Sequence, residues 1–213
     1  MNIIWYGQTC FRIIIPKNGK NEQVGILTDP LNKESGFRSP KLEADIFLFT
    51  NEIKEKKEIS KVNEQGFVIA GPGEYDAKGI YFQGLQAETK NQEKITIYAI
   101  EAEGLKIGHF GKMGQKELSA EQMEIFGGID VLIIPVGGGD ALNAEEAVKI
   151  ITQIEPKIII PMYYRTPKIK TKLDGVEKFL KEVGIKSVQP LPKISIKKKD
   201  INEDEAKIII LEP

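Results

Sequence analysis

The residues best suited to metal or nucleophilic chemistry in this sequence are a single histidine, His109, and a single cysteine, Cys10. A structural zinc site takes four Cys or His ligands, and a catalytic zinc usually takes two or three His with a carboxylate. One residue of each kind supplies neither site, and it also excludes a disulfide framework and a four-cysteine iron–sulfur cluster. On composition alone, only oxygen-ligated cations such as Mg²⁺ or Ca²⁺ remain.

Four loops that follow buried strands are the expected place for a site, because α/β sheets bind ligands beyond the carboxyl ends of their strands. These loops cover residues 50–56, 109–115, 137–143 and 162–165. The third begins with Gly137, Gly138 and Gly139 and leads into a predicted helix, a position where backbone N–H groups can bind an anion. The alternative is that these three glycines serve a tight turn.

The elements that must position these loops change character along the chain. Short β-type runs dominate the first half, and strands alternate with helices in the second, which predicts a mixed α/β sheet assembly covered by helices. We expect one domain over residues 1–213. The predicted strands are 3–6, 11–15, 24–28, 45–50, 67–70, 80–84, 95–101, 105–110, 131–136, 157–161, 194–198 and 207–211. The predicted helices are 119–126, capped by Ser119, 143–154, capped by Asn143, and 174–183, with a weaker charged one over 51–61.

The charge balance argues against two classes of partner. Thirty basic and 31 acidic residues give a net charge of −1, so neither nucleic acid nor an anionic membrane is expected as the main partner. The first residues lack the basic region and cleavage site of a signal peptide, and no apolar run is long enough to cross a membrane. We therefore expect a cytoplasmic protein.

Several segments together resemble the metallo-β-lactamase-fold hydrolases, in collinear order over the chain. They are WYGQTCFRI at 5–13, TDP at 28–30, GPGEYDAKGIYFQG at 71–84, IEAEGLKIGHFGKMG at 100–114, DVLIIPVGGGDALNAEEAVKIITQIEPKIIIPMYY at 130–164 and LDGVEKFLKEVG at 173–184. Among these hydrolases, the sequence is most similar to the branch containing L-ascorbate 6-phosphate lactonase. The resemblance implies a four-layer αββα sandwich with a two-metal centre at one sheet edge.

The residues at the family's metal-ligand positions differ from the family pattern. The pattern Thr-His-x-His-x-Asp-His corresponds to residues 50–56, HxGD to residues 109–112 and IPMHY to residues 160–164. The positions of the family's ligands are therefore occupied by Asn51, Ile53, Glu55, Lys56, Lys112 and Tyr163. His109 matches a position that is not usually a ligand. We therefore expect no zinc and no other cofactor, although Glu52, Glu55 and Glu58 present either a solvated helix face or a site for a hard cation.

Two functions follow from this comparison. The first is a non-catalytic binding or assembly subunit, which forms a homo-oligomer or pairs with a paralogue that keeps the histidines. The second is a hydrolase of a lactone, ester or phosphorylated small molecule, metal-free or bound to a hard cation, with Lys112, Glu55 and Tyr163 as acid–base groups near His109. In the first case, Lys112 simply neutralises Glu55. A small anionic ligand at Gly137–Gly139 is a third possibility.

Overall fold

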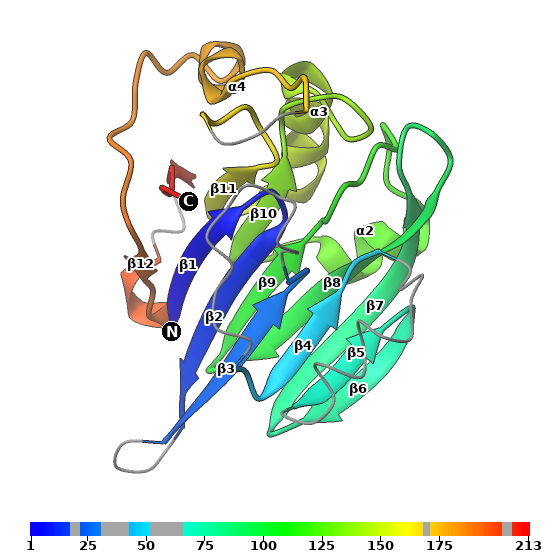
Figure 1. Ribbon diagram of the computed structural model, residues 1–213, viewed down its shortest axis with the longest axis vertical. Helices are drawn as coiled ribbons and strands as arrows, with labels where there is room; N and C mark the ends of the chain where they lie inside the picture. The colour runs from blue at the N-terminus through cyan, green and yellow to red at the C-terminus, as the bar shows by residue number, and fades with distance from the viewer. Residues whose placement is uncertain (18–21, 31–42, 52–65, 168–170, 202–205) are drawn as a thin grey trace.

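The computed structural model describes residues 1–17, 22–30, 43–51, 66–167, 171–201 and 206–213. In this part of the chain two β-sheets pack face to face (Figure 1). The first has the order β12 (Ile194–Ser195), β1 (Asn2–Gly7), β2 (Cys10–Pro16), β3 (Gln23–Thr28), β4 (Ile46–Phe49) and β5 (Phe67–Ala70). The second has the order β13 (Lys207–Ile208), β11 (Ile158–Met162), β10 (Val131–Pro135), β9 (Leu105–His109), β8 (Lys94–Ala102), β7 (Ile80–Glu88) and β6 (Gly73–Ala77).

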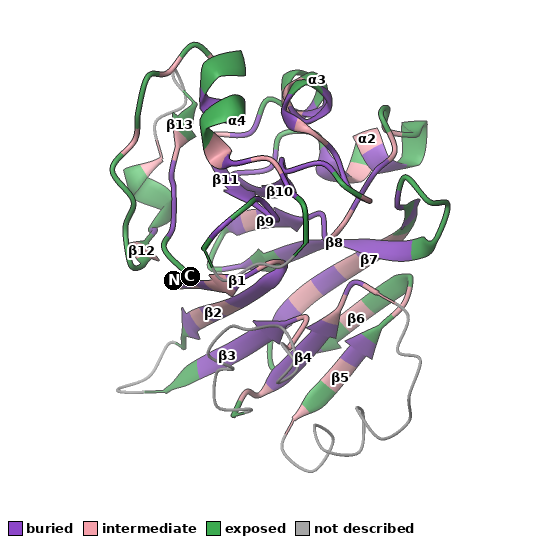
Figure 2. Cartoon of the chain, turned by 45° about the horizontal axis from the view of Figure 1, so that its top comes forward, coloured by how far each residue is buried: buried purple, intermediate pink, exposed green. Residues whose placement is uncertain are grey.

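The burial of the strands follows from their neighbours. In β1, buried and half-buried residues alternate, because one face lies on the core and the other is partly open. Every residue of β10 and β11 is buried, which suits strands that lie between the other sheet and the helices (Figure 2). These two strands are parallel to each other, and β9 is parallel to β10. Their carboxyl ends therefore meet at one edge of the second sheet.

The described helices are α2 (Ala120–Phe126), α3 (Ala144–Ile154), α4 (Val176–Glu182) and the short 3-10 turn η2 (Lys198–Asp200). The three α-helices among them lie along the second sheet (Figures 1 and 2); α2 and α3 begin directly after their predicted caps, α4 begins two residues later than predicted, and the short turn η2 follows β12 and was not predicted. Ser119 caps α2 and Asn143 caps α3, in both cases with a capping box completed by the residue three positions later. Both predicted caps are confirmed.

One large hydrophobic cluster joins the two sheets. Trp5 and Phe11 from the first sheet and Tyr98, Phe82 and Ile107 from the second are all buried in it. A smaller cluster of Cys10, Leu27 and Phe47 lies on the opposite face of the first sheet. The mixed α/β class and the two-sheet arrangement expected from the sequence are confirmed.

Some predicted elements differ from the structure. Residues 73–77 form β6, antiparallel to β7, although their glycine and acidic residues indicate a loop. This edge strand is largely exposed and is held by backbone pairing rather than by apolar side chains. The two terminal strands are only two residues long. Of the charged helix predicted over 51–61, only Asn51 lies within the described residues, and it forms a β-bridge with Ile95.

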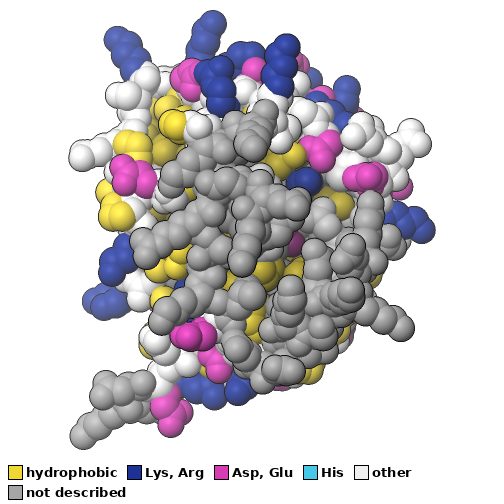
Figure 3. Space-filling view, in the orientation of Figure 1, with side chains coloured by type: hydrophobic (Ala, Val, Ile, Leu, Met, Phe, Trp, Pro, Cys, Tyr) yellow, Lys and Arg dark blue, Asp and Glu magenta, His cyan; other side chains and the backbone are white. Residues whose placement is uncertain are grey.

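The described side chains on the face drawn in Figure 3 carry both signs of charge. On the face in Figure 3, basic and acidic side chains are interspersed around the described residues. Within the described part of the chain, none of the helices combines the length and the apolar character that a membrane crossing requires.

Candidate functional site

The loops after β9, β10 and β11 meet at one edge of the second sheet and carry Lys112, Asp140 and Tyr163. The end of β4 reaches the same edge from the first sheet, because the Thr96 N–H donates to the Thr50 carbonyl at 2.7 Å. A Cβ at Gly111 would come within 2.7 Å of Thr50 Oγ1, so the end of β4 contacts the loop after β9. The described parts of the loops predicted to form the site therefore converge.

Lys112, Asp140 and Tyr163 form a contact group that we call the Lys112–Asp140–Tyr163 cluster. The Tyr163 hydroxyl donates to Asp140 Oδ1 at 2.6 Å, and Lys112 Nζ lies 3.6 Å from Asp140 Oδ2. The ammonium also lies 5.3 Å from the centre of the Tyr163 ring, within the range of a cation–π contact. The Lys112 and Asp140 side chains remain 28% and 22% exposed, so a small molecule can reach them.

Tyr163 is a hydrogen-bond donor in this cluster rather than a base. Burial and the neighbouring Asp140 carboxylate both raise the pKa of the Tyr163 hydroxyl, because each disfavours the phenolate. The phenol therefore keeps its proton at neutral pH and directs it at Asp140. The acid–base role expected for Tyr163 from the sequence stays a prediction.

Asp140 is the member of the cluster that the sequence reasoning did not single out. Glu55 was expected to pair with Lys112, but it lies outside the described residues, and within them the carboxylate beside Lys112 is Asp140. The signal in the sequence was its position directly after Gly137–Gly139, at the end of a buried strand. A charged residue at such a position faces the sheet edge where sites form.

His109 lies beneath the cluster and faces the core. It is fully buried, and its Nε2 lies 3.1 Å from the Thr9 carbonyl and 3.2 Å from Thr28 Oγ1. A carbonyl oxygen only accepts, so Nε2 carries the hydrogen, and Nδ1 accepts from the Gly111 N–H at 3.3 Å. Burial lowers the pKa of His109 and keeps the ring neutral. The ring thereby fixes the turn that precedes Lys112.

Asp29, part of the TDP motif at 28–30, binds the residue at the end of β4. Its Oδ1 accepts from the Thr50 N–H at 2.8 Å, and its Oδ2 accepts from the Thr50 hydroxyl at 2.6 Å. These two bonds tie the end of β4 to the residue that follows β3. Asp29 therefore fixes the start of the loop in which the family's first metal motif would stand.

The glycine loop after β10 is explained mainly by packing. A Cβ at Gly137 would overlap the Tyr163 carbonyl oxygen and come within 2.6 Å of Tyr164 Cα. The Gly138 N–H is already used, since it donates to the Leu142 carbonyl at 2.9 Å. Asp140 also places a negative charge beside the loop. These contacts favour the turn role of Gly137–Gly139 over anion binding.

The described side chains do not fit a two-metal centre. Among the described residues no three His, Cys, Asp or Glu side chains gather closely enough to hold a metal ion. Asn51 donates its side-chain amide to Thr50 Oγ1, Lys112 brings a positive charge, and Tyr163 keeps its proton. Of the remaining family positions, Ile53, Glu55 and Lys56 lie outside the described residues. No metal ligand is assigned here.

Comparison with solved structures gives a likeness over nearly the whole chain. A protein of Thermotoga maritima, described as a proposed Zn-dependent hydrolase of the metallo-β-lactamase superfamily, is 28% identical with a TM-score of 0.77, and the match covers 99% of both chains. A metallo-hydrolase from Ignicoccus hospitalis, 18% identical with a TM-score of 0.59, shares the fold.

Comparison with curated proteins also finds relatives that are named hydrolases. A "UPF0173 metal-dependent hydrolase" of Thermococcus onnurineus is 26% identical in a match covering 100% of this chain and 97% of that protein. A similarly named protein of Thermoplasma acidophilum is 25% identical over 78% of this chain and 84% of the relative. The chain thus spans most of the length of these relatives.

Two expectations from the sequence are wrong in the light of these relatives. The chain was expected to be a non-catalytic subunit without a cofactor, but the proteins it matches over most of their length are named metal-dependent hydrolases. The metal-free hydrolase that was the alternative is wrong for the same reason, because these relatives are named metal-dependent. The expectation rested on motif positions alone. Among the described residues, Asp140 is the carboxylate that contacts both Lys112 and the Tyr163 hydroxyl.

The family is shown by both the sequence and the fold. A family model described as a β-lactamase superfamily domain matches residues 2–163, which include β1 through β11 and all three residues of the Lys112–Asp140–Tyr163 cluster. The fold with its two face-to-face sheets is shared with the structure from T. maritima, at a TM-score of 0.77. The chain belongs to the metallo-β-lactamase superfamily, whose members among its relatives include proteins named metal-dependent hydrolases.

Proposed function

We propose that this protein is itself a metal-dependent hydrolase whose reaction takes place at the Lys112–Asp140–Tyr163 cluster. The observation that carries the proposal is the position of this partly exposed cluster, at the edge where the carboxyl ends of β9, β10 and β11 meet. The metal dependence is supported by the names of the relatives and not by the described side chains, so the following steps concern only the protein's own groups.

Lys112 would stabilise the charge that develops during hydrolysis. When water attacks a carbonyl or phosphoryl centre, negative charge builds up on the oxygen of that centre. A positive group held near that oxygen lowers the barrier because it stabilises the transition state more than the ground state. Lys112 Nζ is held by Asp140 and by the Tyr163 ring, and it stays partly exposed.

Asp140 and Tyr163 would act as positioning residues. Asp140 uses one carboxylate oxygen for the Tyr163 hydroxyl and presents the other to Lys112. With Oδ1 fixed by the short bond from Tyr163, the direction of Oδ2 and therefore the place of the ammonium are fixed. A charge that needs no reorientation during the reaction is the most effective kind.

The substrate class is an ester-type small molecule. Carboxylic esters, lactones and phosphate esters all present an oxygen that becomes more negative on attack, which suits Lys112. The resemblance to the L-ascorbate 6-phosphate lactonase branch adds phosphorylated lactones to this class. We propose this class without choosing one member of it.

The test is a turnover assay across this class with defined metals. The purified protein would be incubated with Zn²⁺, Mn²⁺, Fe²⁺ or Mg²⁺ and then given nitrophenyl esters, simple lactones, phosphate monoesters and phosphate diesters. We expect turnover above the buffer rate for at least one pairing, loss of that turnover with EDTA, and recovery when the metal is returned. No turnover with any pairing contradicts the proposal.

The place of the reaction is tested by removing the charge of Asp140. Asp140→Asn keeps the shape of the side chain but leaves Lys112 without its carboxylate, and we expect kcat/KM to fall about tenfold to 100-fold. Asp174→Asn is the matched control, because Asp174 pairs with Lys178 on the exposed surface. Equal loss in both variants, or no loss in Asp140→Asn, would place the reaction elsewhere.

A further inference from the structure

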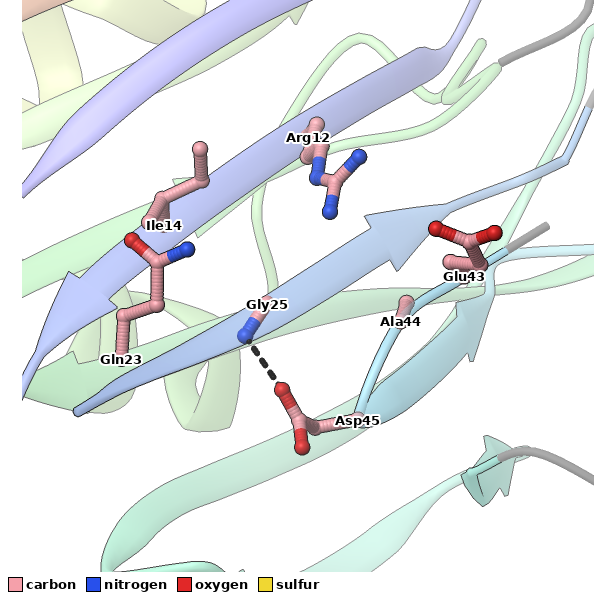
Figure 4. A pocket seen from close by; sticks show the side chains of 7 residues that line it. All are labelled: Arg12, Ile14, Gln23, Gly25, Glu43, Ala44 and Asp45. Carbon is pink, nitrogen blue, oxygen red and sulfur yellow. Dashed lines mark hydrogen bonds between the residues drawn. The ribbon is translucent and has the colours of Figure 1, made fainter. Parts of the chain in front are cut away.

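A polar pocket of about 440 Å³ lies on the face of the first sheet that points away from the second (Figure 4). Phe11, Ile13 and Ile15 of β2 are part of the core between the sheets. Side chains alternate along a strand, so Arg12 and Ile14 point to the opposite face, where they line the pocket. Gly25 of β3 and the residues before β4 complete it.

Arg12 has unused hydrogen-bonding capacity in this pocket. Its Nε is buried and has no hydrogen-bond partner, and no ion pair involves Arg12 within the described part of the chain. A guanidinium presents Nε and Nη hydrogens as a planar fork that matches the two oxygens of a carboxylate. Buried donors in folded proteins are nearly always satisfied, so a donor that no described residue satisfies makes this pocket a candidate ligand site.

The acidic side of the pocket also has one unused charge. Asp45 is already occupied, because Oδ2 accepts from the Gly25 N–H at 2.8 Å and Oδ1 lies 3.7 Å from Lys78 Nζ. Glu43 is exposed and forms no ion pair with any described residue. Figure 4 shows the Arg12 guanidinium and the Glu43 carboxylate coming from the two sides of β3, Arg12 from β2 and Glu43 from the segment before β4. The pocket therefore presents one unpaired positive and one unpaired negative group.

The floor of the pocket beside Arg12 is kept open by the absence of a side chain at Gly25. A Cβ at Gly25 would lie 3.8 Å from Arg12 Nη2 and 3.8 Å from Asp45 Oδ2, at ordinary contact distance. An alanine would therefore fit there without strain and would occupy part of the space beside the guanidinium. This gives a way to fill the pocket without changing any of its charges.

We propose that this pocket binds a free α-amino acid. Its carboxylate would pair with the Arg12 fork, its ammonium would face Glu43, and its side chain would lie toward Ile14 and Ala44, which also line the pocket. A volume of about 440 Å³ is within the range of small-molecule sites. A simple anion would leave Glu43 unpaired, and a simple cation would leave Arg12 unpaired.

The experiment is calorimetric titration of the full-length protein with each of the twenty amino acids, with propionate and ethylamine as single-charge probes. We expect saturable binding of at least one amino acid, and at least about tenfold weaker binding of both single-charge probes. If no amino acid binds, or if propionate binds as well as alanine, the proposal is overturned.

Variants place the binding in the pocket. Arg12→Met and Glu43→Gln should each weaken binding about tenfold or more, and Gly25→Ala should weaken it while leaving every charge in place. Arg165→Met is the control, since Arg165 pairs with Glu177 on the exposed surface. Circular dichroism melting checks that each variant is folded. Unchanged binding in both Arg12→Met and Gly25→Ala overturns the assignment.

Discussion

Lys112 and Arg12 are two basic side chains in partly open places, and they differ in their partners. Lys112 finds a carboxylate and an aromatic ring within the protein, at the edge where the strands of the second sheet end. Arg12 has a buried Nε without a partner, on the outer face of the first sheet. Carboxylates lie near both, but those near Arg12 are either occupied by other groups or come from the other side of β3.

The two basic residues therefore suit different roles. Lys112 is already positioned by groups of the protein, whereas the described residues leave Arg12 Nε without a hydrogen-bond partner, which a ligand can supply. A held ammonium is already oriented when a substrate arrives, which suits stabilisation of a transition state. An unsatisfied guanidinium gains most when a ligand supplies the missing hydrogen bonds, which suits binding. The packing around the two groups differs in the same sense, because the loop near Lys112 is close-packed and the surroundings of Arg12 are open.

The largest expected effect is a difference in stability between two glycine-to-alanine variants, one in the loop near Lys112 and one in the pocket near Arg12. Gly137→Ala places a methyl group on the Tyr163 carbonyl and near Tyr164 Cα, backbone atoms that cannot move without shifting β11. We expect it to lower the free energy of unfolding by about 3 kcal/mol or more, measured by urea denaturation. Gly25→Ala, with its methyl at 3.8 Å from the nearest atoms, should change it by less than about 0.5 kcal/mol.

Equal losses in these two variants would contradict the contrast in packing. A large loss of stability in Gly25→Ala, with little loss in Gly137→Ala, would reverse this contrast. That result would show that the floor of the pocket is closely packed. The slope of the free energy against urea concentration should stay the same in both variants, because neither changes the surface exposed on unfolding.

The next effect is a pH dependence of the free energy of unfolding, which arises from His109. Burial lowers the pKa of His109 below its ordinary value of 6.5, so between the two values the unfolded chain binds more protons than the folded one. Stability should therefore fall as the pH drops below about 6.5, by up to about 1.4 kcal/mol per pH unit. Urea denaturation at several pH values between 7.5 and 5.5 measures this slope.

His109→Gln provides the comparison, because no other histidine is present in the chain. We expect the slope between pH 7.5 and 5.5 to shrink strongly in this variant and to persist in Arg12→Met. Burial raises the pKa of Glu146, but hydrogen bonds from the Asn143 N–H and Lys90 lower it overall. Its contribution is therefore lost only when the pH falls below about 4.5. An unchanged slope in His109→Gln would show that another group is responsible.

The smallest expected effect is the energetic coupling of each basic residue to its neighbouring carboxylate. A double-mutant cycle of Lys112→Met and Asp140→Asn should give a coupling of about 1 kcal/mol in the free energy of unfolding, as expected for a half-buried pair. The same cycle with Arg12→Met and Glu43→Gln should give a value near zero. Equal couplings in the two cycles would remove the distinction between the paired and the unpaired charge.

Much of the scaffold could be predicted from local patterns. The alternation and the buried apolar runs located most strands, and the spacing from Ser119 to Gln122 and from Asn143 to Glu146 fixed two helix starts. The predicted loops also meet at one edge, because parallel strands place their carboxyl ends together. These features depend on residues close together in sequence.

The contacts within the site could not be predicted in the same way. Asp140 lies 28 residues from Lys112 and 23 from Tyr163, so their meeting depends on the order of strands in the sheet. Glu55 was chosen because it lies in a family motif, which says nothing about its distance from Lys112. The pocket around Arg12 likewise depends on the register of β2 with β3, which places Ile14 opposite Gly25.

The most direct test of the account compares the loss of each basic side chain on the same reaction. With a substrate and metal that support turnover, kcat/KM would be measured for the wild type, Lys112→Met and Arg12→Met. The account predicts a loss of about 100-fold for Lys112→Met and a change of less than about twofold for Arg12→Met. Turnover that survives in Lys112→Met would contradict the reaction centre proposed here.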